Sequence, residues 1–305
     1  MNALYVDSGM DDAQRRAALY GGQLFTYSPR PAALALVEHA RRMIRAAFGD
    51  LDPTTAQHRM PVEEYAKLLT DLKPTFIHHP ESKACIQHLL TEMGCDPERT
   101  YFDVPRMRTS TSDGYLTTGI AYAFHPHRDT WYSAPMCQLN WWIPIYEIEP
   151  DNAMAFHPAY WSRALKNGSR DYNYQEWNRT SRFIASQQVG VDTRKQPKPE
   201  EPVQLDPQMR PIVPPGGTII FSAGQLHSSV PNTTGKTRFS IDFRTVHLDD
   251  VAAMRGAPNY DCACTGTTMG DYLRVTDLAH VPDDLQASYM AGTPVVVAPE
   301  PAAAR

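Results

Sequence analysis

The stretch "GGTIIFSAGQLHSSVPNTTGKTRFSIDFR", residues 216–244, contains two runs rich in β-branched and aromatic residues. The runs 216–223 and 237–248 favour β-strands, and the small, turn-forming residues between them favour a reversal of the chain. His227 comes directly after the first run, and Arg238 opens the second. The stretch therefore predicts two strands of a β-rich fold, with one histidine and one arginine placed at their ends.

Further short β-rich runs with turn residues between them lie upstream, at 100–107, 119–125, 138–147 and 152–158. Such a series is typical of a sandwich or barrel. The N-terminal part instead shows apolar residues at helical spacing, which predicts helices at 31–48, 61–72 and 81–94. We expect a mainly β fold with α-helices, in which a double-stranded β-helix (a jelly-roll or cupin-like core) is flanked by N-terminal helices.

The 305 residues are consistent with one domain. We expect this domain to span 1–290, with a helical part over about 1–98 and the β core over about 99–250. The polar segment at about 162–211 is too long for a simple connection, and this length suggests a lid or binding loop. The last residues, 291–305, read as a flexible tail.

Composition limits the possible partners. The formal net charge is −5, which argues against a broad surface for nucleic acid or anionic membranes. No apolar stretch is long enough to cross a bilayer, and no signal peptide is visible. Five cysteines favour reduced thiols in a cytoplasmic protein, and the Cys262-x-Cys264 pair lacks the second pair that a zinc site usually has. The oligomeric state cannot be predicted.

The motif "HPHRD" carries candidate metal ligands. His125, His127 and Asp129 alternate along the chain, so an extended backbone would place them on one face. A cupin that used His125 and His127 would usually place a glutamate a few residues later, and none follows. The pair His127 and Asp129 needs one more histidine, which His227 supplies. Two imidazoles and one carboxylate leave three positions of an octahedral ion open, which suits non-haem Fe(II).

Arg238, eleven positions after His227, can take a role at the same site. A bidentate co-substrate such as 2-oxoglutarate would fill two open positions on the iron, and O2 the third. The far carboxylate of that molecule then needs a fixed cation. The planar guanidinium of Arg238 can bind a carboxylate through two hydrogen bonds, which lysine cannot do.

With these residues in view, the sequence resembles the Fe(II)/2-oxoglutarate-dependent dioxygenases, and specifically the phytanoyl-CoA dioxygenase-like superfamily. The resemblance rests on "HRD" (127–129), "LHSS" (226–229), "TRFSIDFR" (237–244) and "LNWWIPIYEIEPDNAMAFHPAYW" (139–161), and it covers about residues 100–250. The segment "DNAMAFHPAYW" departs from the usual pattern of the family, which affects the nearby loops and the substrate more than the metal.

The resemblance implies that His127, Asp129 and His227 are the iron ligands and that Arg238 anchors 2-oxoglutarate. It also implies that Phe124 and Ser229 lie around the co-substrate. Other candidates come from the residues themselves. Gln138 and Asn140 are polar within an apolar run and could bind 2-oxoglutarate or substrate, while Trp131, His157 and Arg244 are candidates for substrate contact.

These expectations together describe a single-domain oxygenase that hydroxylates, desaturates or cyclises a small molecule, with release of succinate and CO2. The substrate would be a metabolite or a natural-product intermediate. Because family members that halogenate lack the carboxylate ligand, the presence of Asp129 favours hydroxylation. Two alternatives stay open: a metal-dependent hydrolase or isomerase of the cupin type, and a non-catalytic barrel that binds a small ligand.

Overall fold

The computed structural model describes residues 3–181, 184, 187–188, 190–194 and 196–296. Ten strands of this part of the chain form an eight-stranded mixed sheet and a two-stranded sheet. The large sheet has the order β1-β2-β7-β5-β9-β3-β10, and β4 also pairs with β9. Its strands are β1 (Leu4–Val6), β2 (Leu24–Tyr27), β3 (Thr100–Phe102), β4 (Arg106–Ser110), β5 (Leu139–Pro144), β7 (Thr218–Ser222), β9 (Arg238–His247) and β10 (Leu273–Arg274). The small sheet pairs β6 (Met154–Phe156) with β8 (His227–Ser229).

Strand β9 organises the large sheet. One of its edges pairs with β5, and the other pairs with β4 and then β3. Side chains alternate between the two faces of a strand. Phe239, Ile241 and Phe243 are therefore buried in the main hydrophobic core, while Arg238 and Arg244 share the opposite face, where they line a cavity.

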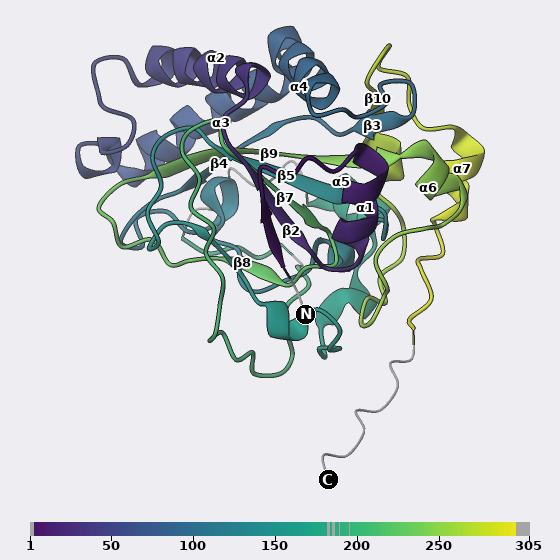
Figure 1. The fold of residues 1–305 in the computed structure, drawn as a ribbon. Coiled ribbons are helices and arrows are strands. Elements are labelled where there is room, and N and C mark those ends of the chain that lie inside the picture. Colours follow the sequence, from purple (N-terminus) through teal and green to yellow (C-terminus); the bar gives the residue numbers. More distant parts are fainter. Residues whose placement is uncertain (1–2, 182–183, 185–186, 189, 195, 297–305) are drawn as a thin grey trace.

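The helices are α1 (Asp12–Tyr20), α2 (Pro31–Phe48), α3 (Val62–His78), α4 (Pro80–Glu92), α5 (Tyr174–Thr180), α6 (Leu248–Ala252) and α7 (Asp283–Ser288). Apart from α5, which carries the cavity residues Tyr174 and Trp177, they add side chains to the core side of this sheet. Figure 1 shows α2, α3 and α4 gathered along one side of the strands. Their apolar side chains, such as Leu36, Ile44 and Leu69, join the same core as Phe239. Burial of this apolar surface is the main force that holds the helices on the sheet.

The N-terminal part is not only helical, which corrects the sequence-based expectation. The three expected helices are present as α2, α3 and α4, and α3 continues past Pro74 to His78. In addition, β2 pairs with β7 and extends the large sheet, with β1 parallel to it. A four-residue strand that is buried throughout shows no alternation of polar and apolar residues, so its pattern did not distinguish it from a loop.

The strand expected at 119–125 is also absent. A 3-10 turn, Gly119–Ala121, takes its place and is followed by irregular chain. Gly119 has a positive φ of 60°, a conformation that turns the backbone away from an extended strand and that glycine adopts readily. The later runs form β5, β6, β7 and β9 as expected.

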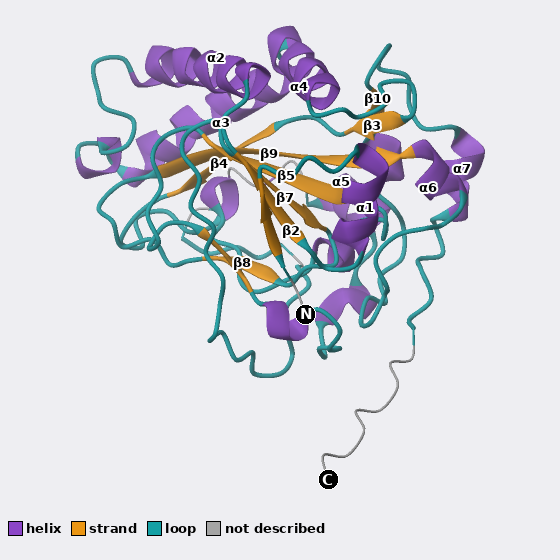
Figure 2. Cartoon of the chain, in the orientation of Figure 1, coloured by secondary structure: helices purple, strands orange, loops and turns teal. Residues whose placement is uncertain are grey.

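The described residues of the segment 162–211 contain α5, a 3-10 turn at Gly168–Asp171 and isolated bridges. Figure 2 shows this side of the molecule built largely from loops. Of the expected tail, 291–296 are described and 297–305 lie outside the described residues. Among the helices of the described ranges, none has the length and apolar character needed to cross a membrane.

Candidate metal centre and cavity

The three residues expected to bind metal lie together. His127 and His227 face each other in an antiparallel bridge, and each backbone N–H donates to the carbonyl of the other (2.9 and 3.0 Å). Asp129 follows at the start of a 3-10 turn, Asp129–Tyr132. Its Oδ1 lies 3.3 Å from His127 Nε2 and 3.8 Å from His227 Nε2. The three ligand atoms all lie within 4.8 Å of one another, a spacing from which one ion can be held.

Backbone carbonyls fix the orientation of both imidazoles. His127 Nδ1 is 2.8 Å from the carbonyl oxygen of His125, and His227 Nδ1 is 3.0 Å from that of Gln225. A carbonyl can only accept, so each Nδ1 carries the proton and donates it. Each Nε2 is therefore left with its lone pair directed at the centre, in the form that a metal requires.

The charge states also suit a metal. Burial and the neighbouring His127 together lower the pKa of His227 to about 3. Burial alone would raise the pKa of Asp129, but the close contact with His127 and the charge of Arg244 outweigh it and hold that pKa well below its usual range. At neutral pH the site thus offers a neutral imidazole at His227 and an ionised carboxylate at Asp129.

A chain of hydrogen bonds orients the carboxylate of Asp129. The Tyr272 hydroxyl, whose pKa is raised well above its usual value by burial, donates to Gln138 Oε1 at 2.6 Å. Gln138 Nε2 must then be the donor, and it donates to Asp129 Oδ2 at 3.2 Å and to Asn140 Oδ1 at 2.7 Å. Because Gln138 donates to it, the Asn140 atom on this side must be the oxygen, and the Asn140 amide nitrogen lies on the other side. This nitrogen, Nδ2, is buried and has no hydrogen-bond partner among the described residues.

Arg244 belongs to the same end of the site. It pairs with Asp103 at 3.0 Å, and its Nε lies 3.8 Å from Asp129 Oδ2. Asp242 is a third carboxylate within 3.8 Å. Arg244 is therefore balanced by acidic residues of the protein and supports the Asp129 carboxylate from the side away from the histidines.

The triad lies in the wall of a cavity of about 410 Å³, a volume in the range of small-molecule sites. Gln138, Asn140 and Arg244 also line it. So do Phe124, which stacks on the His127 ring with centroids 5.0 Å apart, and Ser229. The Ser229 backbone N–H donates to the Phe124 carbonyl at 3.0 Å, which ties β8 to the segment that carries His127.

Arg238 lines the same cavity, and its charge is not balanced by the protein. Its side chain is 6% exposed, and no carboxylate lies within 4 Å of it among the residues described. One nitrogen, Nη1, donates to the Asn152 carbonyl at 2.7 Å, and the guanidinium lies over the Trp142 ring at 5.5 Å. Its Nε has no hydrogen-bond partner in the part of the chain that the structure describes. Burial lowers the pKa of Arg238 to about 10, so an anion bound here would relieve an unfavourable desolvated charge.

Two of the residues expected to contact substrate lie elsewhere. Trp131 is fully buried, and its indole N–H donates to Asp261 Oδ1 at 2.7 Å. His157 is held between the Leu205 carbonyl (3.3 Å) and the Ser228 hydroxyl (3.0 Å). Neither lines the cavity. For Trp131 the reason is the 3-10 turn, which rotates the chain by about 120° per residue and so sends Trp131 away from the direction of Asp129.

The neighbours of the ligands in "HPHRD" have structural partners. His125 Nδ1 is 3.0 Å from the Tyr122 hydroxyl, and its Nε2 is 2.8 Å from the Pro197 carbonyl. It therefore faces the 190s segment and is not one of the three grouped ligands. Arg128 is buried and points away from the centre, where it pairs with Asp261 at 3.0 Å.

Several cavity residues were missed in the sequence. Asp242 could have been found, because it lies an even number of positions from Arg238 and Arg244 along β9 and so shares their face of the strand. Lys73, on α3, gave no such signal, because helical spacing does not show which residue reaches a distant cavity.

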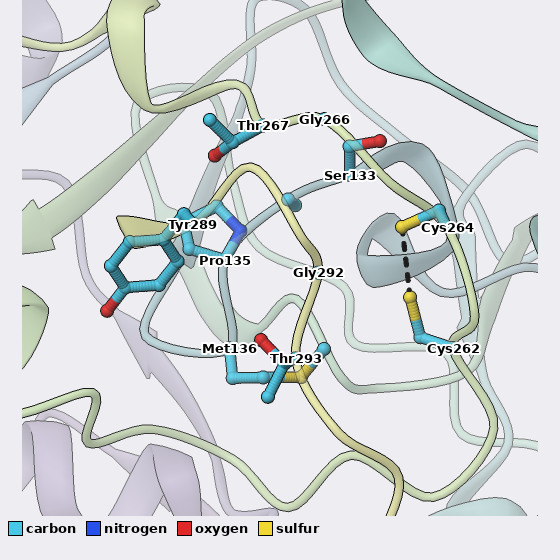
Figure 3. A pocket seen from close by; sticks show the side chains of 11 residues that line it. Ser133, Pro135, Met136, Cys262, Cys264, Gly266, Thr267, Tyr289, Gly292 and Thr293 are labelled. Atoms are coloured by element: carbon cyan, nitrogen blue, oxygen red, sulfur yellow. Dashed lines mark hydrogen bonds between the residues drawn. The ribbon is translucent and has the colours of Figure 1, made fainter. Parts of the chain in front are cut away.

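The Cys262-x-Cys264 pair lies at a separate, small cavity of about 10 Å³, room for about one water molecule. Figure 3 shows the two thiols facing each other, with their Sγ atoms 3.1 Å apart. Both also contact the Thr130 carbonyl. Within the described ranges, no group of three candidate metal ligands includes either cysteine.

No protein-family model matches the chain, and no curated protein matches its sequence. Solved structures do resemble it. The non-heme alpha ketoglutarate dependent epimerase SnoN from nogalamycin biosynthesis is 13% identical, over 77% of this chain and 84% of that chain, with a TM-score of 0.36. EvdO2 from Micromonospora carbonacea var. aurantiaca, complexed with 2-oxoglutarate, is 13% identical over 78% and 92%, with a TM-score of 0.43. The non-heme monooxygenase ThoJ is 12% identical over 71% and 69%, with a TM-score of 0.35.

Proposed function

We propose that the protein is a non-haem Fe(II)/2-oxoglutarate-dependent oxygenase that hydroxylates a small molecule. One observation carries the proposal: the wall of one cavity contains both a compact two-histidine, one-carboxylate group and a buried arginine without a carboxylate partner among the described residues. The two-histidine, one-carboxylate group suits Fe(II) with open coordination positions. The buried arginine suits the far carboxylate of a keto-diacid.

The donor set fits the metal. His127 and His227 would hold the ion through Nε2, since their Nδ1 atoms are engaged with carbonyls. Asp129 would hold it through Oδ1, since its Oδ2 accepts from Gln138. Fe(II) bound there with 2-oxoglutarate would use O2 to hydroxylate a C–H bond, with one oxygen atom of O2 entering the substrate, the other entering succinate, and CO2 released.

The residues around the centre would then bind and orient the reactants. Arg238 would bind the far carboxylate of 2-oxoglutarate, beside Ser229 and Phe124. The unpartnered Asn140 amide N–H would donate to an oxygen of a bound ligand. Gln138 and Tyr272 would keep the Asp129 carboxylate in one orientation throughout the reaction.

We further propose that the two sheets form a jelly-roll core and that residues 1–290 form one oxygenase domain. The strand order β4-β9-β5-β7, the separate β6-β8 pair and the His127–His227 bridge support this topology. The substrate would be a metabolite or a natural-product intermediate. A metal-dependent hydrolase or isomerase would use the metal group but leave Arg238 without a role, and a barrel that only binds a ligand would leave the metal group without one.

The test is an anaerobic titration of the protein with Fe(II) and 2-oxoglutarate, followed by visible spectroscopy. The wild type should show the charge-transfer band of an iron-chelated keto acid. His127→Ala should lose the band, and His125→Ala should keep it, because His125 belongs to the same motif but faces Pro197. Absence of the band in folded, iron-loaded wild type, or its loss in His125→Ala alone, would contradict the proposal.

A further inference from the structure

The cavity wall carries more positive charge than its acidic residues balance. Among the described residues, six cations line it: Lys73, Arg106, Arg108, Arg194, Arg238 and Arg244. Four of them have an acidic partner, namely Asp103 for Arg106, Asp242 for Arg108, Asp192 for Arg194, and Asp103 for Arg244. Within the described part of the chain, Lys73 and Arg238 have none within 4 Å. The proposed co-substrate would use Arg238, which leaves Lys73 unexplained.

Lys73 is held with its ammonium group at the cavity. It lies on α3 and is 6% exposed. Its Nζ donates to the Thr109 hydroxyl at 3.0 Å and to the Ile120 carbonyl. An ammonium group has three N–H donors, so one is left without a partner among the described residues. Burial and the charge of Arg108 together lower the pKa of Lys73 to about 7. An anion placed beside a desolvated amine of this kind stabilises its charged form.

Lys73 and Arg238 cannot share one carboxylate. On β4, Ser110 pairs with Arg238 and Thr109 with Phe239, and adjacent residues of a strand point to opposite faces. Lys73 contacts the Thr109 side chain, so it lies on the helix side of β4, while Arg238 lies on the other. Among the described strands β4 pairs only with β9, so the cavity can reach Lys73 around the free edge of β4.

We propose that Lys73 binds a carboxylate of the primary substrate, a proposal that rests on the oxygenase function above. The cavity wall around Lys73 includes Pro74, Ile77, Ile120 and Tyr122. An apolar or aromatic body attached to the acid would pack against these side chains. A single ammonium group with one free donor suits a monoanionic carboxylate better than a phosphate ester, which brings two charges and more acceptors. The substrate class is therefore an aryl or alkyl carboxylic acid.

The test measures binding to the full chain loaded with Ni(II), which does not turn over, and 2-oxoglutarate. The probes are 4-phenylbutanoate, its neutral amide 4-phenylbutanamide and phenyl phosphate, titrated by calorimetry. In the wild type, the acid should bind at least about tenfold more tightly than the amide, the difference that about 1.4 kcal/mol produces. Lys73→Met should abolish this preference. Lys67→Met, an exposed position on the same helix, should keep it.

Two controls distinguish failure of the carboxylate site from misfolding and from failure of the oxygenase proposal. Lys73→Gln keeps a hydrogen-bonding group without the charge, and it should also lose the preference, which covers the case in which Lys73→Met does not fold. The 2-oxoglutarate affinity is measured in the same samples, so failure of the oxygenase proposal appears as absent 2-oxoglutarate binding in the wild type. Equal binding of acid and amide, tighter binding of phenyl phosphate, no binding of the acid at millimolar concentration, or a preference that survives both Lys73 variants would overturn the carboxylate site.

Discussion

Replacement of Arg238 by methionine should weaken 2-oxoglutarate binding while it stabilises the protein without ligand. The guanidinium is buried without a carboxylate partner among the described residues, and burial lowers its pKa from 12.5 to about 10. That shift corresponds to a cost on the order of 3 kcal/mol for the charged side chain. The substitution also loses the bond to the Asn152 carbonyl and the contact with Trp142, about 2 kcal/mol together.

The balance is a gain of roughly 1 kcal/mol, or a rise of about 1–3 °C in the melting temperature of the unliganded Arg238→Met variant. Binding of 2-oxoglutarate changes in the opposite direction. Loss of a charge-assisted contact with a carboxylate costs about 2–4 kcal/mol, so the dissociation constant should rise roughly 30- to 1000-fold. Both quantities can be measured on one sample, by differential scanning calorimetry and by anaerobic titration of the Fe(II)–2-oxoglutarate band.

Arg194→Met is the matched control. Arg194 also lines the cavity, but it pairs with Asp192 at 2.6 Å. Its removal leaves an unbalanced carboxylate, so this variant should lose stability and keep its 2-oxoglutarate affinity within about threefold, a change of less than 1 kcal/mol. If Arg238→Met melted well below the wild type and bound 2-oxoglutarate normally, the assignment of Arg238 as an unbalanced anchor would be refuted.

Three more outcomes follow from the metal centre. Asp129→Ala removes one of three ligands and should weaken Ni(II) binding by at least about 100-fold, as measured by calorimetry; unchanged affinity would exclude the site. Tyr272→Phe frees the Gln138 amide to rotate, and it should weaken metal binding about tenfold, whereas Tyr289→Phe, which removes a buried hydroxyl bonded to the Val251 carbonyl, should not. In metal-free protein, the folded pKa values of His227 (about 3) and His125 (about 4) lie below the ordinary 6.5. The unfolded chain therefore binds these protons first, so stability should be complete above pH 6.5 and fall by about 1.4 kcal/mol per pH unit for each histidine as the pH drops toward 4. Urea denaturation in EDTA measures this slope, and a flat profile would contradict it.

The sequence predicted the parts of the site that follow a strand or a short motif. His127, Asp129 and His227 could be grouped because two lie two residues apart and the third follows a strong strand pattern. Arg238 and Arg244 lie six positions apart on β9, so the alternation of the strand places them on the same face. Within such elements, the backbone period alone indicates which side chains lie on one face.

The residues that the sequence did not reveal depend on contacts between distant segments. Tyr272 reaches Gln138 across 134 positions, and Lys73 meets β4 through helix packing. Neither contact leaves a periodic signal. Trp131 was misplaced for a local reason, because a 3-10 turn replaced the extended backbone after Asp129. The strand β2 was missed because a short strand buried throughout carries no alternation, and β1 was missed because three residues are too few to show one.

The cavity wall combines two kinds of chain. His227 lies on β8, His127 bridges to it and Arg238 lies on β9, whereas Tyr172, Trp177 and Arg194 come from the segment 162–211, whose described residues add no strand to the large sheet. Exchange or random mutation of this segment would therefore leave the scaffold of the proposed metal centre in place. For directed evolution, a library of variants in this segment is the natural choice, because it can change the substrate while the residues of the proposed metal centre stay unchanged.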